Sequence, residues 1–552
     1  MKVLSKEKNV ILLGNEAVVR GALEAGIMFA STYPGTPVSE IGDTFSRIAK
    51  ETGRYFEYST NEKIALEVAT GAALSGIKSL VSFKHFGLNV AADSLMPIAY
   101  VGTPLVIIMA DDPNCWSSAQ SEQDSRYYSR MAHIPMLEPS TPEEAKEFTK
   151  IATELAWKYK TPIIVRLTTR VSHTRGIVKC SNIKKTNMGG FFKKDINRYN
   201  NLPPNTVRMH IEILQKIEKI KKEVSEKIKI NQIIGGKKSD IGIIVSGVGF
   251  NYVMEAFDDI GIKLPVLKLG MTYPAPDKKI SSFIKKFKKI LVVEELDPVL
   301  ENHVRMLAKD ANPKLKIYGK DLLPKAGEYK EESLVYALSK LTKIKCRIDV
   351  ATHMKQYHKL NVPRRPPLLC YKCQYRPLFS VLHEIAPDAV FGGDIGCYIL
   401  GMYPPYNVQD FIFSMGASQG VTHGIKKVSK QKAIAIIGDS TFFHAGIPGL
   451  INAVYNKSNP IIIILDNRIT AMTGHQPHPG SDFTSTWEKQ DGISIENIVR
   501  ACGVKNIRII DPTNMDEVKK TVKEFMNNKE VSVIIAKKQC WLFGEKMKRR
   551  SE

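Results

Sequence analysis

The chain has 552 residues, of which 43% are hydrophobic and 24% are charged. That length is enough for about three or four domains with their own cores. No stretch approaches the roughly 20 consecutive apolar residues of a membrane-spanning helix, and the apolar run near the start is too short for a signal peptide. We therefore expect a cytoplasmic protein without a membrane segment.

The net charge is +23, which raises nucleic acid or an acidic protein as possible partners. The basic residues are dispersed through helical and linker stretches such as 216–229 and 285–290, and they are not interleaved with aromatic residues. A lysine-rich composition with solvated helix faces explains this pattern, so no nucleic-acid partner is expected. An acidic protein stays open as a partner.

Eight cysteines are spread along the chain, at positions 115, 180, 346, 370, 373, 397, 502 and 540. Disulfides are rare in cytosolic proteins, so cysteines that cluster in sequence indicate a metal site before they indicate bridges. Cys370 and Cys373 form a Cys-X-X-Cys pair. The alternatives for this pair are a zinc site and a redox-active dithiol.

Residues 1–176 alternate apolar strands with helices, which predicts a first α/β domain. The second strand ends in the turn TYPGTP, which contains Thr36 and which composition alone explains as an ordinary strand-to-helix turn. Glu62 opens a helix rich in small residues. It either complements the positive end of that helix or serves as a carboxylate in an apolar interface, and the residue alone does not decide between the two.

Two later segments of this domain carry polar side chains after strands. Lys84 and His85 follow one such strand, and we expect them in a loop. The loop after the next strand is rich in Ser and Gln and carries Arg126. Such loops often hold ligand-binding groups, and a guanidinium there could pair bidentately with a carboxylate. The alternative is a surface ion pair of Arg126 with Asp124 or Glu122.

The middle of the chain changes composition. Residues 177–238 are rich in Lys, Asn and Ile and carry a charged amphipathic helix from about Thr206 to Lys229, so we expect them to link two domains. Residues 239–345 alternate strands and helices again, which predicts a further α/β domain. Its turn SGVGF lacks the full dinucleotide-binding fingerprint, and a tight turn explains it. A Pro-rich basic connector leads to the last predicted domain, residues 346–552.

The stretch from Gly438 to Asn467 places an acid and an amide after two apolar strands. Residues 433–437 (AIAII) and 460–465 (PIIIIL) are continuous runs typical of buried parallel strands, with a helix between them. Asp439 and Asn467 follow the carboxyl ends of these strands, where ligands bind in open α/β sheets and where Mg²⁺ finds oxygen ligands. The alternative is a pair of ordinary turns.

Several motifs together resemble those of the 2-oxoacid:ferredoxin oxidoreductases. They are the Tyr-Pro-X-Thr-Pro turn, Asn-Glu before a small-residue helix, Cys-X-X-Cys before Gly-Asp-Ile-Gly-Cys, and Gly-Asp-Ser followed at a distance by Asn467. Within that superfamily the chain is most similar to the alpha subunits of indolepyruvate ferredoxin oxidoreductases, through phrases such as KHFGLNVAAD, EQDSRYY, VVEELDP and TAMTGHQPHPG. The resemblance implies a multidomain thiamine diphosphate-binding fold of the α/β class, with parallel sheets flanked by helices.

The resemblance assigns thiamine diphosphate to two parts of the chain. Residues 1–176 would bind the pyrimidine, with Glu62 hydrogen-bonded to N1′ of the aminopyrimidine and Thr36 facing the thiazolium and the 2-oxo acid. Arg126 and His85 complete the predicted catalytic residues. Residues 239–345 would resemble the carboxy-terminal domain of transketolase.

Residues 346–552 would bind the diphosphate and Mg²⁺. The implied Mg²⁺ ligands are Asp439, Asn467 and the backbone carbonyl of Ile469. The residues implied to cradle the cofactor are Ile395, Gly396, Cys397, Gly438, Ser440, Thr441, Ala471 and Met472.

Four cysteines, 370, 373, 397 and 540, match in order the ligands of the cluster nearest thiamine in this superfamily, and four thiolates suit a [4Fe-4S] cluster. The chain departs from the family's Cys-Pro-Gly-Cys-Pro-His-Arg pattern, because it carries Cys-Tyr-Lys-Cys-Gln-Tyr-Arg at 370–376. The family's carboxy-terminal ferredoxin-like domain is also missing from the sequence. We therefore expect electrons to leave through one inner cluster to a ferredoxin-type subunit or an external carrier.

The resemblance predicts an alpha subunit that oxidatively decarboxylates indolepyruvate or a related aryl 2-oxo acid. Coenzyme A would take the acyl group, ferredoxin the electrons, and a small beta subunit would complete a dimer of heterodimers. One alternative keeps thiamine but drops oxidation, as a decarboxylase or carboligase does. A distant alternative is a non-catalytic basic binding protein built on an enzyme fold.

Overall fold

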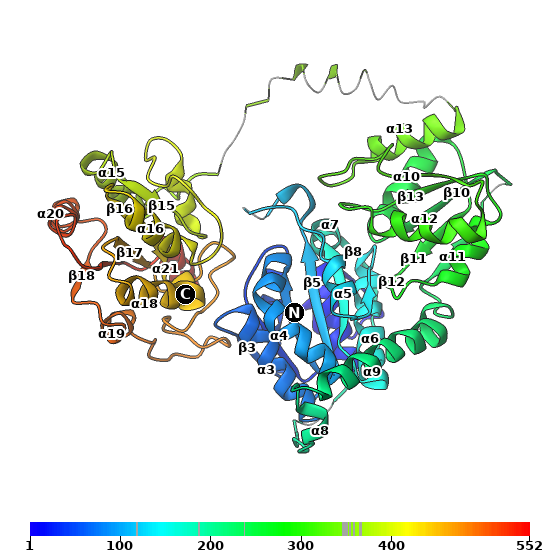
Figure 1. The fold of residues 1–552 in the computed structure, drawn as a ribbon, viewed down its shortest axis with the longest axis horizontal. Helices are drawn as coiled ribbons and strands as arrows, with labels where there is room; N and C mark the ends of the chain where they lie inside the picture. Colours follow the sequence, from blue (N-terminus) through cyan, green and yellow to red (C-terminus); the bar gives the residue numbers. More distant parts are fainter. Residues whose placement is uncertain are drawn as a thin grey trace. The chain divides into compact units, whose positions relative to one another are not determined.

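The computed structural model describes residues 1–117, 120–185, 188–236, 238–344, 352, 355–356, 359–360, 362–363 and 367–551, without the side chains of 550 and 551. Cys346 and the predicted domain boundary at 345–346 lie outside these residues. The chain forms two compact units (Figure 1). The first holds Met1–Glu57 and Glu62–Val362, and the second holds Tyr58–Asn61 and Pro363–Glu552.

The first unit is built on a seven-stranded sheet in the order β12-β6-β7-β5-β4-β2-β3. The strands from β6 through β2 are parallel, whereas β12 is antiparallel to β6. Nearly every residue of β4, β5 and β7 is buried, as expected of parallel strands covered on both faces. The strands are β2 (Phe29–Thr32), β3 (Tyr55–Tyr58), β4 (Ser79–Lys84), β5 (Leu105–Asp111), β6 (Met136–Leu137), β7 (Ile163–Thr168) and β12 (Met271–Tyr273).

Helices surround this sheet. The longest, α6, begins with Thr141, whose hydroxyl accepts a hydrogen bond from Glu144 N, and with Pro142 at the first helical position. The helices are α1 (Gly14–Ala25), α2 (Ser39–Ile48), α3 (Glu62–Leu74), α4 (His85–Val101), α5 (Arg126–Met131), α6 (Pro142–Tyr159), α7 (Thr169–His173), α8 (Ile196–Tyr199) and α9 (Asn205–Ile220). The charged helix predicted in the linker is thus α9, which continues into a π-helical turn, Lys221–Ser225.

One expectation for this unit needs correction. The loop expected at Lys84 and His85 is wrong, because Lys84 ends β4 in an extended conformation and His85 begins α4 without a spacer. β1 (Asn9–Leu13) pairs with β8 (Arg175–Lys179) in a separate antiparallel ribbon. It does not enter the seven-stranded sheet.

A five-stranded sheet, ordered β14-β13-β10-β11-β9, completes the first unit. Alternate residues of β10 pack on α10 and α13 from one face and on α11 and α12 from the other. Strand β12 follows β11 in sequence yet pairs with β6, so the seven-stranded sheet crosses the predicted boundary at residue 239. The strands are β9 (Gln232–Ile234), β10 (Ile241–Ser246), β11 (Val266–Leu269), β13 (Lys289–Val293) and β14 (Lys316–Tyr318), and the helices are α10 (Gly249–Ile260), α11 (Asp277–Ile284), α12 (Val299–Ala311) and α13 (Glu331–Thr342).

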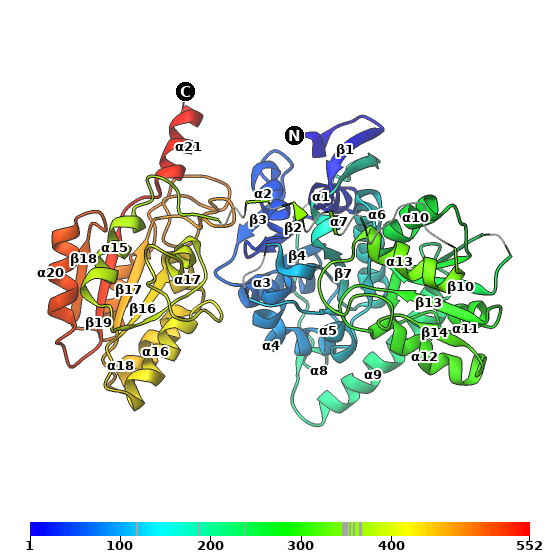
Figure 2. The same cartoon turned by 90° about the horizontal axis from the view of Figure 1, so that it is seen from above.

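The second unit is a parallel sheet in the order β15-β16-β17-β19-β18. In Figure 2, α20 lies on one side of its strands and α16 and α18 lie on the other. Its strands are β15 (Val390–Gly392), β16 (Ala433–Gly438), β17 (Ile461–Asp466), β18 (Asn506–Ile510) and β19 (Ser532–Lys537). Its main helices are α15 (Tyr375–Ile385), α16 (Ala417–Val428), α18 (Ile447–Tyr455), α19 (Ile495–Ala501), α20 (Met515–Phe525) and α21 (Trp541–Ser551).

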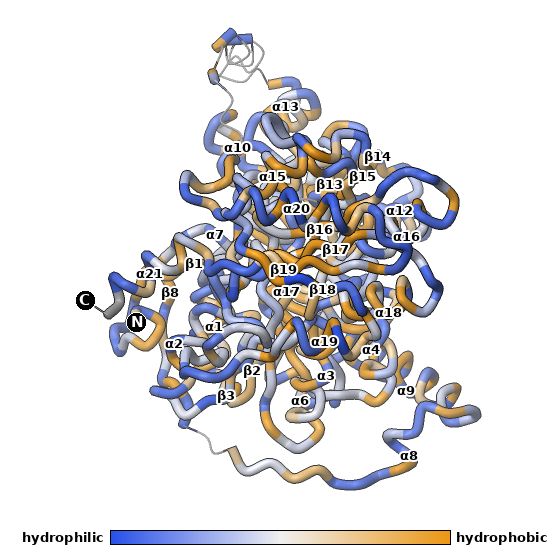
Figure 3. Tube along the Cα trace, turned by 90° about the vertical axis from the view of Figure 1, so that its left-hand side faces the viewer, coloured by the Kyte–Doolittle hydropathy of each residue, from blue (hydrophilic) through white to orange (hydrophobic). Residues whose placement is uncertain are grey.

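β16 and β17 are the two strands predicted around the Gly438–Asn467 stretch, and each is placed within one residue of the prediction. Figure 3 shows both as strongly hydrophobic. Their side chains alternate between two cores, with Ile436 and Ile463 in one and Ile437 and Ile464 in the other. In the part of the chain that the structure describes, no helix combines enough length and apolar character to cross a membrane.

Candidate active site

Asp439 and Asn467 lie together at the carboxyl edge of the sheet in the second unit. They follow β16 and β17, which are neighbours in that sheet. Asp439 Oδ2 accepts hydrogen bonds from the backbone N–H of Asn467 at 3.0 Å and of Arg468 at 2.8 Å, and Oδ1 accepts one from Ser440 N at 2.8 Å. Both side chains are buried. The backbone of the second loop therefore fixes the carboxylate of the first.

Asp439 shares this edge of the sheet with a second buried carboxylate. Asp466, the last residue of β17, is buried beside Asp439, and burial together with the charge of Asp439 raises its pKa to about 6. Arg468 acts on both carboxylates, but its guanidinium pairs with Asp482. Two neighbouring carboxylates and an amide oxygen form a donor set of the kind that Mg²⁺ prefers. The residues present therefore fit a divalent cation.

Tyr375 orients the amide of Asn467. Its buried hydroxyl lies 2.8 Å from Asn467 Nδ2, which donates to it, while Asn467 Oδ1 accepts from Ile469 N at 3.0 Å. The amide is thereby held with its nitrogen toward the core. Tyr375 is two residues after Cys373, so the segment with the first cysteine pair also supports the Asp439–Asn467 pair.

His478 touches the same carboxylate. Its Nε2 lies 3.1 Å from Asp439 Oδ2, and both side chains are buried. Gly480 N donates to His478 Nδ1 at 3.1 Å, so the neutral ring carries its proton on Nε2, the nitrogen that faces Asp439. Nε2 makes no hydrogen bond with a described residue despite this short distance, so His478 lies against the carboxylate without fixing it.

Two glycines of the predicted cofactor cradle allow an aromatic ring to approach the backbone. A Cβ on Gly396 would lie 2.3 Å from the Tyr398 ring, and one on Gly438 would lie 2.8 Å from it. Tyr398 and Thr441 both donate to Ile395 O, at 2.9 and 3.0 Å. These contacts join the segment after β15 to the one after β16 at the same sheet edge. Of the other predicted residues, Ala471 is partly buried and Met472 is 46% exposed.

The four predicted cluster cysteines converge on this edge. Burial, together with the neighbouring thiols, raises the pKa of Cys397 to about 12 and of Cys373 to about 11. Cys540 N donates to Asn467 O at 3.2 Å, which places this cysteine beside the Asp439–Asn467 pair, whereas Cys370 is exposed. Among the described residues, however, no three His, Cys, Asp or Glu side chains are arranged to hold a metal ion. Four thiols are the donors that an iron–sulfur cluster needs, but in this structure their sulfur atoms are not arranged around a common metal position.

In the first unit, the residue predicted to contact the thiamine pyrimidine is Glu62. It is buried at the start of α3, and its carboxyl group lies against Gly87 of α4, where an added Cβ would be 2.6 Å from Glu62 Cγ. Thr36 is partly buried in the turn after β2, and β2 is the neighbour of β4 in the sheet. Glu62, Gly87 and Thr36 thus belong to neighbouring elements.

Two parts of the chain match families of thiamine-dependent proteins. Residues 20–231 match the family described as pyruvate flavodoxin/ferredoxin oxidoreductase, thiamine diP-bdg. Residues 394–536 match the thiamine pyrophosphate enzyme, C-terminal TPP binding domain. Glu62 falls in the first match, and Asp439 and Asn467 fall in the second.

Curated relatives match the chain almost from end to end. Indolepyruvate oxidoreductase subunit IorA of Methanothermobacter thermautotrophicus is 44% identical, over 97% of this chain and 87% of the relative. The chain belongs to the IorA family. Subunit IorA of Archaeoglobus fulgidus is 40% identical, over 98% of this chain and 88% of its own length. These relatives confirm the family resemblance that the motifs predicted.

A solved structure supports the fold of the IorA family member. The 2-oxoglutarate:ferredoxin oxidoreductase from Magnetococcus marinus is similar with a TM-score of 0.50 and 18% identity, over 60% of this chain and 65% of that chain. The α/β thiamine diphosphate-binding fold predicted from the sequence is confirmed.

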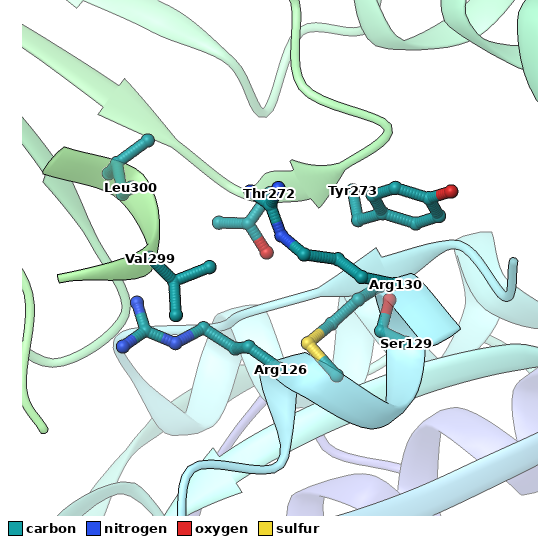
Figure 4. Close-up of a pocket in the computed structure, with 8 residues that line it drawn as sticks. Arg126, Ser129, Arg130, Thr272, Tyr273, Val299 and Leu300 are labelled. Atoms are coloured by element: carbon teal, nitrogen blue, oxygen red, sulfur yellow. The ribbon is translucent and has the colours of Figure 1, made fainter. Parts of the chain in front are cut away.

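Arg126 of this family member lies inside the first unit and is already paired. Its guanidinium donates to Asp124 and Glu294 and to the backbone carbonyls of Glu295 and Asp297. Figure 4 shows the side chain leaving α5 toward Val299 and Leu300, beside a cavity of about 10 Å³, which is space for about one water. The ion pair with Asp124 that sequence offered as the alternative does form, but it is buried. The substrate role of Arg126 stays a prediction that this geometry disfavours.

His85 is fully buried, with Nδ1 3.2 Å from Ala110 O and Nε2 3.3 Å from Ser121 O. Burial lowers its pKa, so the neutral ring, which has one N–H, can donate to one of these carbonyls at a time. The ring ties the junction of β4 and α4 to the loop after β5. Its predicted catalytic role remains untested by this geometry.

Sequence reasoning missed three contributors to these sites: Lys84, Tyr375 and His478. Each stands in a segment that the motifs singled out, namely KHFG, CYKCQYR and TGHQPHPG. The motifs carried the signal, but the residue that each side chain lies against, Gly35, Asn467 or Asp439, comes from a distant segment. Spacing along the chain could not supply that partner.

Proposed function

We propose that the chain is the alpha subunit of an indolepyruvate ferredoxin oxidoreductase, acting on indolepyruvate or a related aryl 2-oxo acid. The observation that carries the proposal is the buried Asp439–Asn467 pair at the edge of β16 and β17, inside the match to the TPP binding domain. The IorA relatives support the substrate class. In the net reaction the 2-oxo acid loses CO₂, its acyl group forms a thioester with coenzyme A, two electrons pass to two ferredoxins, and one proton is released.

Thiamine diphosphate would supply the carbon nucleophile that attacks the keto group and takes up the electron pair left by CO₂. Asp439, Asn467 and the carbonyl of Ile469 would hold Mg²⁺ and so orient the diphosphate. Glu62 would share a proton with N1′ of the aminopyrimidine, and Thr36 would face the 2-oxo acid. The residues proposed to line the cofactor are Ile395, Gly396, Cys397, Gly438, Ser440, Thr441, Ala471 and Met472.

We also propose that Cys370, Cys373, Cys397 and Cys540 bind one [4Fe-4S] cluster. The convergence of four thiols at the edge that holds Asn467 supports this, since a cluster supplies the positive charge that thiolates need. Electrons would pass from this cluster to ferredoxin or a ferredoxin-like subunit. A small beta subunit would complete the complex, which we expect to be a dimer of heterodimers.

The test uses the complex of this chain with its small subunit, purified without oxygen. We expect bound thiamine diphosphate, about four irons and four acid-labile sulfides per alpha subunit, and reduction of a viologen dye that requires both an arylpyruvate and coenzyme A. Asp439→Ala should abolish thiamine binding and activity, whereas Asp388→Ala, at an exposed position, should leave both unchanged.

Two results would redirect the proposal. Release of an aldehyde without coenzyme A or an electron acceptor would show a non-oxidative decarboxylase, the second candidate. Its motivation is the exposed Cys370 in an altered first cysteine pair. The oxidoreductase proposal would be wrong if the purified complex contained thiamine diphosphate but no iron and reduced no dye with any arylpyruvate.

A further inference from the structure

Lys84 lies at the carboxyl edge of the seven-stranded sheet, as the last residue of β4. Its stem runs against the turn that contains Thr36, because a Cβ on Gly35 would be 3.0 Å from Lys84 Cγ and 3.1 Å from Cδ. A larger residue at position 35 would push the lysine aside. The bare backbone of Gly35 therefore sets the path of the Lys84 stem.

The helix that follows Lys84 leads to Glu62. α4 begins at the next residue, and Gly87 in its first turn lies against the Glu62 carboxyl group. The short segment Lys84–Gly87 thus connects the Thr36 turn with the carboxylate predicted to activate thiamine. Burial lowers the pKa of Lys84 below its usual range, while the charges of Glu62 and Asp112 act in the opposite direction.

Within the described residues, the Lys84 ammonium makes no hydrogen bond or ion pair with the protein, and its Nζ lies 5.2 Å from the centroid of the Phe86 ring. Asp112 is not its partner, since its carboxylate oxygens accept from Thr169 and Ser117. A partly buried ammonium is costly unless a negative group joins it. Lys84 therefore differs from Arg126, whose guanidinium is surrounded by carboxylates and carbonyls.

We propose that Lys84 binds the carboxylate of the 2-oxo acid, the role that the sequence suggested for Arg126. The proposal rests on the proposed function, because it concerns the substrate of the same site. A 2-oxo acid held near Glu62 brings a second negative charge to a carboxylate, and a cation between them offsets the repulsion. Lys84 supplies that cation from the turn that also carries Thr36.

The test compares Lys84→Met, which keeps the stem against Gly35, with Lys84→Arg and with Lys263→Met at an exposed position of the same unit. In the complete complex, Lys84→Met should raise KM for phenylpyruvate about 10- to 100-fold, because a hydrogen bond to a charged group is lost. KM for coenzyme A and Kd for thiamine diphosphate should change less than about twofold. Lys84→Arg should recover part of the loss, and Lys263→Met should behave as wild type.

A second readout does not need turnover. Wild-type complex should bind phenyllactate more tightly than its neutral amide, phenyllactamide, and Lys84→Met should erase that preference by weakening phenyllactate alone. Equal weakening of both ligands, an unchanged preference, or a shift confined to coenzyme A or thiamine diphosphate would overturn the proposal. A wild-type complex that oxidises no arylpyruvate would instead count against the proposed function, while the phenyllactate comparison would still decide the role of Lys84.

Discussion

The contact between Gly87 and Glu62 shows how a glycine, which has no side chain, sets the position of the carboxylate that is predicted to activate thiamine diphosphate. A Cβ on Gly87 would lie 2.6 Å from Glu62 Cγ and 2.8 Å from Glu62 Oε1. The same Cβ would lie 2.9 Å from Phe83 Cβ, which the backbone of β4 fixes, whereas the glutamate side chain can rotate, so the glutamate is the group that moves most readily. The position of the carboxylate thus depends on the glycine.

We therefore predict that Gly87→Ala lowers kcat about 10- to 100-fold while the protein remains folded, because a displacement of about 1 Å is enough for such a loss. Steady-state kinetics and far-ultraviolet circular dichroism of the complex would measure this. Gly71→Ala on α3 is the matched control, since a Cβ there meets nothing within 4 Å. It should keep full activity, and equal activity of both variants would contradict the role of Gly87.

Tyr375 occupies the position at which the family pattern has histidine, and in the structure it binds the side chain of Asn467. Its hydroxyl accepts the Asn467 amide N–H in a fully buried setting. Tyr375→Phe removes this acceptor and leaves the amide free to rotate away from the orientation in which we propose that it binds Mg²⁺. A single neutral hydrogen bond contributes about 0.5–1.5 kcal/mol.

We predict that Tyr375→Phe weakens Mg²⁺-dependent thiamine diphosphate binding about 3- to 10-fold. Titration of the cofactor-free complex, followed by circular dichroism, would give the Kd. Tyr455→Phe makes the same change at a residue that is 82% exposed and should leave the Kd unchanged. An unaltered Kd in Tyr375→Phe would show that Asn467 needs no such support.

At the scale of elements, a buried ionic network joins the two sheets of the first unit. Arg166 of β7 donates to Asp111 at 2.6 Å and to Glu138 at 2.7 Å, and Arg126 of α5 donates to Glu294 after β13. Glu294 in turn accepts from the first backbone N–H groups of α12. Carboxylates outnumber cations in this network, which favours the protonated form of at least one carboxyl group. Burial and the charge of Glu328 raise the pKa of neighbouring Glu295 to about 7.

This raised pKa makes stability depend on pH. The folded protein binds the Glu295 proton more tightly than the unfolded chain, so the contribution of this group to stability is complete below about pH 4.5 and is lost as pH rises to about 7. Glu295→Gln mimics the protonated side chain and keeps an acceptor for Tyr329 N–H. At pH 8 the free energy of unfolding of Glu295→Gln should exceed that of wild type by on the order of 3 kcal/mol, which raises its Tm by several degrees. Near pH 4.5 the two Tm values should match.

Thermal unfolding at both pH values would check this prediction. Glu154→Gln, at an exposed position of α6, is the control and should shift Tm little at either pH. A Tm difference that does not grow with pH would show that Glu295 is ionised throughout.

For the molecule as a whole, the sequence predicted the features that short stretches of neighbouring residues determine. The continuous apolar runs of β16 and β17 predicted a parallel sheet, and the Gly-Asp and Asp-Asn ends predicted polar groups at its edge, as the structure shows. Sequence could not predict pairings over long distances. Arg126 meets Glu294, 168 residues later, and β12 leaves its neighbours to pair with β6. Lys84 was misplaced in a loop because nothing local marks a strand that turns directly into a helix.

The net charge of +23 belongs to the same scale, since no local cluster accounts for it. We predict that it steers an acidic ferredoxin to the complex, so that kcat/KM for ferredoxin falls at least about tenfold as NaCl rises from about 50 to 500 mM. A small neutral electron acceptor carries no charge to steer, and its kcat/KM should change less than about twofold over the same range. Stopped-flow reduction of both acceptors by the arylpyruvate-reduced complex would compare them. Equal salt dependence would assign the effect to the catalytic steps, and the surplus of lysine and arginine would then have no part in choosing the acceptor.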